Sequence, residues 1–182
     1  MGIRSNVLWI TRTGVFIALL IVMQVVTSGL SNQLITGSIV NLILIISVMT
    51  CGMATGVSVG IISPIVAKFF SIGPIWTIIP FIIIGNCVLV LLWYIIGNQN
   101  FKTKKLSYIL ALLVASLSKF LTLYYGIVKF AIPTLLDVPE KKAVILSNMF
   151  SVPQLVTALI GGGLAIIILP ILKPVISNKI SE

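Results

Sequence analysis

Long apolar runs separated by short polar segments dominate the chain and predict its elements. The runs do not alternate with polar residues, as the stretch from Ile166 to Leu169 shows, so they do not fit the strands of a membrane β-barrel. A helix of about 20 residues spans the hydrocarbon core of a bilayer, where the backbone must satisfy its own hydrogen bonds. We therefore predict an all-α polytopic membrane protein, one integral domain over residues 1–182 with six transmembrane helices at 9–30, 36–51, 56–70, 75–97, 106–131 and 143–172.

The composition excludes several classes of protein. Apolar types make up 59% of the residues and charged types 8%, whereas a soluble domain carries about 25% charge. The absence of histidine removes histidine acid–base chemistry and most transition-metal sites. No Gly-x-x-x-x-Gly-Lys-Ser/Thr phosphate loop is present, so uphill transport would need an ion gradient or a separate ATPase. We expect no catalytic residues, no metal and no cofactor, and we interpret Cys51 and Cys87 as apolar filler.

The net charge of +9 arises from cations that flank the predicted spans. No basic block is long enough for a nucleic-acid-binding arm, so we expect no nucleic-acid partner. Positive residues are enriched in cytoplasmic loops of membrane proteins. With the N-terminus inside, seven cations lie inside and four outside, which predicts two cytoplasmic termini: Arg4, Arg12, Lys102, Lys104, Lys105, Lys173 and Lys179 against Lys68, Lys129, Lys141 and Lys142.

One charge lies deep in a predicted span. Lys119 is about 13 residues into the fifth helix, and Ser116, Thr122 and either Tyr125 or Gly126 share its face. A charged side chain inside a membrane faces protein or water rather than lipid. No acidic residue is predicted in any span, and an unpaired ammonium would lose its proton or bind an anion. We favour a role as counter-ion for the carboxylate or phosphate of a solute over a lysine that extends along its helix to the surface.

Amide side chains on other spans reach a similar depth. Asn86 lies in the fourth helix and Gln154 in the sixth, next to Pro153. Each amide alone could instead join two helices, and Trp76 could equally be an interfacial anchor. Several deep polar groups at one level favour a shared cavity. The candidate substrate-binding residues are Lys119, Asn86, Gln154, Asn148, Tyr125, Trp76, Gln33 and Asn41.

Small residues recur at intervals of four, mainly in the inner half of the predicted bundle. This spacing lets helices approach closely, and we expect packing within the chain to account for most of the pairs. A pair that faces outwards could dock a partner subunit. The pairs are Gly14 with Ala18, Gly52 with Gly56 and Gly60, Ala111 with Ala115, and Ala158 with Gly162.

Several segments together resemble a known family over nearly the whole chain. These segments are Thr36–Asn41, Gly56–Pro64, Ile79–Asn86, Ser118–Phe120 and Phe150–Thr157. They are similar to the substrate-binding S-components of energy-coupling factor (ECF) vitamin transporters. The resemblance implies a protein of the bacterial cell membrane that binds a micronutrient tightly from outside, in a cavity of its outer half closed by loops.

The same resemblance implies partner subunits that supply the energy for uptake. An S-component docks on an ECF scaffold transmembrane subunit driven by two cytoplasmic ATPase subunits, and it topples in the membrane to release its cargo. The family docks through a small-residue motif in its first helix, often Ala-xxx-Ala, which corresponds here to Gly14 and Ala18. Family ligand contacts often come from the first outer loop and the fourth, fifth and sixth helices, which hold Gln33, Asn86, Lys119, Asn148 and Gln154.

Alternatives to an S-component for a small anionic vitamin, such as pantothenate, lipoate or a flavin, remain open. A proton-coupled secondary transporter usually needs an intramembrane carboxylate or histidine, and the predicted spans offer neither. A structural subunit of a larger membrane complex would use the polar residues only to join helices. A membrane enzyme is least favoured, because a dyad of Ser116 and Lys119 would come from one helix without an oxyanion hole.

Overall fold

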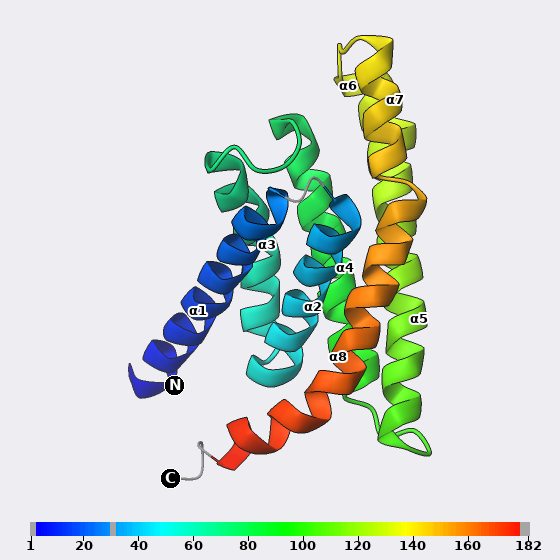
Figure 1. Ribbon diagram of the computed structural model, residues 1–182. Coiled ribbons are helices and arrows are strands. Elements are labelled where there is room, and N and C mark those ends of the chain that lie inside the picture. The colour runs from blue at the N-terminus through cyan, green and yellow to red at the C-terminus, as the bar shows by residue number, and fades with distance from the viewer. Residues whose placement is uncertain (1–2, 30–31, 179–182) are drawn as a thin grey trace.

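The computed structural model describes residues 3–29 and 32–178, with side chains for 6–29 and 32–172. Within these ranges the fold is all-α and contains no strand, which confirms the predicted class (Figure 1). The long helices are α1 (Ile3–Ser28), α2 (Gln33–Cys51), α3 (Met53–Phe69), α4 (Ile79–Gly97), α5 (Lys104–Leu123) and α8 (Val152–Asn178). Shorter elements complete the chain: a 3-10 turn η1 (Trp76–Ile78), a π-helix η2 (Tyr124–Ala131), α6 (Ile132–Leu135) and α7 (Glu140–Met149).

Five helical stretches of the described chain are long and apolar enough to span a membrane: Asn6–Ser28, Gln33–Cys51, Trp76–Gly97, Lys104–Leu135 and Glu140–Leu172. The helix Met53–Phe69 is apolar but shorter. In the most apolar stretch of α1, 17% of the residues are buried inside the protein, whereas in that of α2 44% are buried. The exposed apolar side chains of α1 therefore suit a lipid environment, and α1 is the more loosely held of the two helices.

The predicted sixth helix, over 143–172, is interrupted in the structure. Helix α7 ends at Met149, and α8 begins at Val152. The reason lies in Pro153, which has no N–H to donate to the carbonyl of Met149 four residues earlier, and whose ring disfavours an unbroken helix at that carbonyl. The break places a free backbone carbonyl in the middle of what the apolar pattern predicted as one helix.

The helices form a bundle in which α2 packs along α8 and α4 along α5, while α1 packs against α2 and α3. The described ends of α1 and α8 nearest the chain termini lie at the same end of the bundle, and α6 and α7 extend beyond the opposite end (Figure 1). This arrangement fits an even number of crossings, as the six predicted spans require. The α1–α2 connection and the α7–α8 break therefore belong to the half remote from the termini.

Small residues allow several helices to touch. A Cβ atom added to Gly161 of α8 would lie 2.5 Å from the backbone oxygen of Ser38, and one on Gly56 would lie 2.5 Å from the Cβ of Val48. Ala111, Ala115 and Ala158 are fully buried. These contacts confirm that such residues pack within the chain. The pair Gly14 and Ala18 differs, because both residues are exposed and a Cβ on Gly14 would meet no atom within 4 Å.

Candidate substrate cavity

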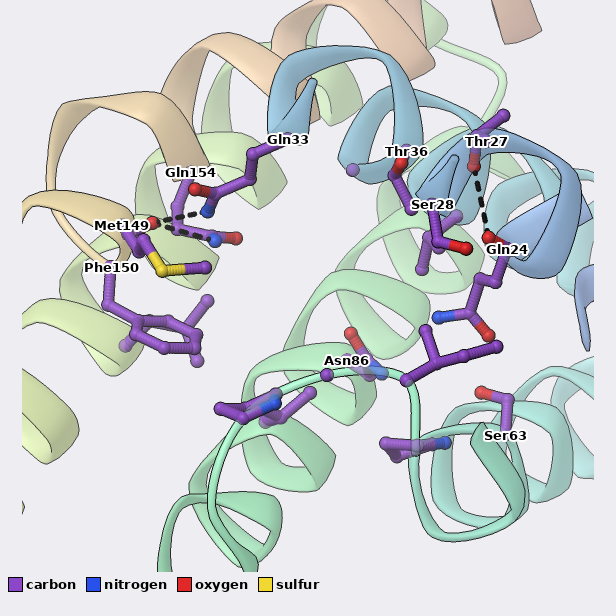
Figure 2. A pocket seen from close by; sticks show the side chains of 18 of the residues that line it. Gln24, Thr27, Ser28, Gln33, Thr36, Ser63, Asn86, Met149, Phe150 and Gln154 are labelled. Atoms are coloured by element: carbon purple, nitrogen blue, oxygen red, sulfur yellow. Dashed lines mark hydrogen bonds between the residues drawn. The ribbon is translucent and has the colours of Figure 1, made fainter. Parts of the chain in front are cut away.

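A cavity of about 360 Å³ lies in the half of the bundle remote from the termini (Figure 2). Every long helix contributes to its wall, together with the break between α7 and α8. The lining residues are Gln24, Thr27, Ser28, Asn32, Gln33, Thr36, Gly37, Val40, Ser63, Pro64, Ile72, Gly73, Pro74, Ile82, Asn86, Lys119, Leu123, Met149, Phe150 and Gln154. Four of the eight candidate residues, Lys119, Asn86, Gln154 and Gln33, line this cavity.

Lys119 is the charged member of this lining and is only 3% exposed. Its Nζ donates to Oδ1 of Asn41 at 2.6 Å and to Oδ1 of Asn86 at 2.8 Å. These lengths are typical of charge-assisted hydrogen bonds. As an ammonium, which has three N–H donors, Lys119 would keep one donor for the cavity after the two amides are satisfied.

The two asparagines are themselves held in place. Nδ2 of Asn41 donates to Oγ1 of Thr157 at 3.3 Å, and Nδ2 of Asn86 donates to the backbone oxygen of Gly60 at 3.3 Å. Since an ammonium only donates, both amide oxygens must face Lys119. Asn41 is 1% exposed and supports Lys119 without lining the cavity. The arrangement is a buried cation positioned by neutral groups from α2 and α4.

The face that sequence periodicity assigned to Lys119 does not extend to Tyr125. Ser116 is fully buried, and its Oγ has no hydrogen-bond partner within the part of the chain that the structure describes. Beyond Leu123 the chain becomes the π-helix η2. Tyr125, six residues after Lys119, would lie about 120° from it around an ideal α-helix; in the structure it is 62% exposed, packs edge-on against Tyr124 at 5.5 Å, and does not line the cavity.

Two further candidates also lie outside the cavity. Trp76 is 49% exposed, and its ring contacts that of Phe69 edge-on at a centroid distance of 5.3 Å. Asn148, in the last turn of α7, is exposed as well. The alternative role of Trp76 as an interfacial residue is the one that fits its exposure.

Gln33 and Gln154 converge on one backbone atom. Their Nε2 atoms donate to the carbonyl of Met149 at 2.7 Å and 3.1 Å respectively (Figure 2). This is the carbonyl that Pro153 leaves without a helical partner, and unpaired carbonyls in a lipid-embedded protein are unfavourable. Both glutamines thus line the cavity and also close the break between α7 and α8.

Helix α1 contributes polar residues to the cavity that the sequence did not single out. Gln24, Thr27 and Ser28 line the cavity from the last turns of this helix. Their spacing of three and four residues in an otherwise apolar stretch is a polar face, so the signal was present in the sequence. These residues lie near the predicted end of the span, whereas the candidates were chosen at the depth of Lys119. Thr36 and Ser63 also line the cavity, and small hydroxyl residues in membrane helices are too common to be informative alone.

In a comparison with protein families, residues 9–173 match a family described as "ECF transporter, substrate-specific component". No curated protein and no solved structure matches the chain significantly. The family match agrees with the multi-pass apolar helices. The chain belongs to the family of substrate-specific components of ECF transporters.

Proposed function

We propose that this substrate-specific component captures a small organic anion, a vitamin or related micronutrient, from outside the bacterial cell. The observation that carries the proposal is Lys119, a buried ammonium on the cavity wall whose neighbours Asn41 and Asn86 are neutral. Taking a charge out of water is unfavourable unless the charge is paired. A carboxylate or phosphate that accepts the third N–H of Lys119 would complete the site.

The size of the cavity narrows the class of substrate. Ligand pockets commonly measure about 300–1,000 Å³, and a volume of about 360 Å³ lies near the lower limit of this range. It favours compact monoanions of the size of pantothenate or lipoate over a flavin. Ile82, Leu123 and Phe150 offer apolar contacts for the carbon skeleton of such a molecule.

The energy for uptake would come from other subunits. The chain contains no P-loop, and its family implies association with an ECF scaffold and ATPase subunits. The exposed pair Gly14 and Ala18 on α1 offers a flat, small-residue surface on which a scaffold helix could pack. With the termini in the cytoplasm, the cavity would open to the outside and the start of α1 would face the ATPases.

The substitution Lys119→Met tests the binding role. We expect the affinity for the anion that co-purifies with the protein, identified by mass spectrometry, to fall by about 100-fold or more, since removing one member of a buried charge pair typically has such an effect. Lys129→Met is the matched control, because Lys129 is exposed outside the cavity. Unchanged affinity in a folded Lys119→Met protein, judged by its elution profile and thermal stability, would refute the role.

The substitution Gly14→Leu tests the docking surface. We expect ligand binding by the isolated protein to be unchanged, because a side chain at Gly14 meets open space, and uptake by the assembled transporter to be largely lost. Gly163→Leu on α8 is the control, since a Cβ there also meets no atom within 4 Å. Full uptake with Gly14→Leu would place the docking surface elsewhere.

A further inference from the structure

Several hydroxyl groups around the cavity already donate hydrogen bonds to backbone carbonyls. Thr27 Oγ1 donates to the carbonyl of Met23 at 2.7 Å, and Ser28 Oγ donates to that of Val25 at 2.8 Å. Thr36 Oγ1 lies 3.5 Å from the carbonyl of Asn32 in the same arrangement. A hydroxyl has one donor and two acceptor lone pairs. After bonding to their own helices, these three groups can offer a ligand only acceptors.

Two glutamine side chains add further hydrogen-bond acceptors to the cavity wall. Gln33 and Gln154 each spend an N–H on the carbonyl of Met149, and neither side-chain oxygen accepts a hydrogen bond within the described residues. Oε1 of Gln24 is enclosed by protein and has no hydrogen-bond partner there, so it is not within reach of a ligand. The side-chain oxygens of Gln33 and Gln154, from α2 and α8, remain available to donors on a ligand.

These acceptors stand on two sides of the cavity. Thr27, Ser28 and Thr36 lie on one side and Gln33 and Gln154 on the other, with Asn86 between and below them (Figure 2). Asn86 is bonded to Lys119, so the cation marks one end of the cavity. The acceptors surround the space that the remainder of a bound molecule would occupy.

Resting on the proposed function, we infer that the substrate is a monoanion whose remainder carries at least two hydrogen-bond donors, hydroxyl or N–H groups. Its anionic group pairs with Lys119, and its donors reach the hydroxyl oxygens of Thr27 and Thr36 on one side and the side-chain oxygen of Gln154 on the other. A purely aliphatic acid would fill the same volume but would leave these oxygens desolvated and unpaired. Sites built around polar partners discriminate strongly against ligands that lack them.

Matched pairs of monoanions test this inference by binding to the purified protein. Pantothenate carries two hydroxyls that N-(3,3-dimethylbutanoyl)-β-alanine lacks, and the ureido ring of biotin carries N–H groups that the dithiolane ring of lipoate lacks. We expect the member with more donors in at least one pair to bind about 10- to 100-fold more tightly. Pantothenol, the neutral alcohol counterpart of pantothenate, measures the contribution of charge separately.

Variants assign the preference to the cavity wall. Thr27→Val and Thr36→Val each keep the side-chain shape and remove a hydroxyl, and we expect both to weaken the binding of donor-rich members while leaving donor-poor members unchanged. Thr11→Val is the control, because Thr11 on the same helix makes an equivalent bond to the carbonyl of Val7 at 2.9 Å but lies outside the cavity.

The outcomes separate the inference from the proposed function. Equal affinity for both members of every pair that binds, or an undiminished preference in both Thr27→Val and Thr36→Val, would overturn the donor requirement and leave anion capture intact. Binding of pantothenol as tight as that of pantothenate, or tight binding of monoanions by Lys119→Met, would overturn anion capture itself. Donor preference that falls in the threonine variants and anion affinity that falls in Lys119→Met would support both.

Discussion

The α2–α8 interface and the cavity share helix α2 and are built in opposite ways. At the interface Gly161 brings the backbone of α8 against Ser38 and Asn41, so that not even a methyl group fits between them. At the cavity Thr36 and Val40 of α2 line open space together with polar side chains of other helices. Close packing therefore supports the polar site. The tight α2–α8 interface fixes Asn41, whose side-chain oxygen accepts a hydrogen bond from Lys119.

Asn41 connects the two regions. It belongs to the crowded side of α2, where its amide bonds to Thr157 of α8, yet its oxygen reaches Lys119 at 2.6 Å. A functional side chain keeps its geometry when the residues behind it are themselves locked by packing. Lys119 therefore depends on a helix contact that touches no ligand.

The largest expected effect comes from filling the interface. A methyl group in Gly161→Ala would lie 2.5 Å from a backbone oxygen, which a side-chain rotation cannot relieve. We expect a loss of about 3 kcal/mol of stability, at the upper end for overpacking, measured as thermal denaturation in detergent, together with weaker ligand binding. In Gly163→Ala, where the added methyl meets no atom within 4 Å, both should be unchanged. A Gly161→Ala protein as stable as the wild type would show that the two helices can separate without cost.

A smaller effect is expected from changing the charge of the cavity while keeping its shape. Asn86→Asp would give Lys119 a carboxylate partner in place of an amide oxygen and would cancel the local positive charge. We expect the protein to fold and its affinity for the anion to fall by about 10- to 100-fold, measured by calorimetry. Asn148→Asp adds the same charge at an exposed position outside the cavity and should bind normally. Unaltered affinity in Asn86→Asp would mean that charge does not govern binding.

The smallest effect is expected at the junction of α7 and α8. Gln33→Leu removes the 2.7 Å bond to the Met149 carbonyl but leaves the bond from Gln154. We expect a loss of about 1 kcal/mol of stability and faster ligand dissociation, measured by stopped-flow fluorescence. Gln99→Leu, in an exposed segment outside the cavity, serves as the comparison. Ligand dissociation at the wild-type rate would show that the α7–α8 junction does not control release of the ligand from the cavity.

Hydropathy and helical periodicity were enough to predict the membrane class and the centre of the candidate site. The all-α fold and the depth of Asn41, Asn86 and Lys119 needed only long apolar runs and a few buried polar positions. The prediction placed Tyr125 on the face of Lys119, but six residues of α-helix leave two side chains about 120° apart, and Tyr125 is exposed. The sequence also did not predict that one carbonyl would bind both Gln33 and Gln154, because that contact joins segments far apart in sequence.

The π-helix η2 makes the part of the protein remote from the termini sensitive to chain length. In an α-helix each residue turns the chain by about 100°, so one residue more or less before α6 rotates the later elements relative to Lys119. A single-residue insertion or deletion between 124 and 131 would therefore turn α6 and α7 relative to the cavity. Such a length change would bear on the α7–α8 break, whose residues Met149, Phe150 and Gln154 line the cavity, and would leave Lys119 and Asn86 in place.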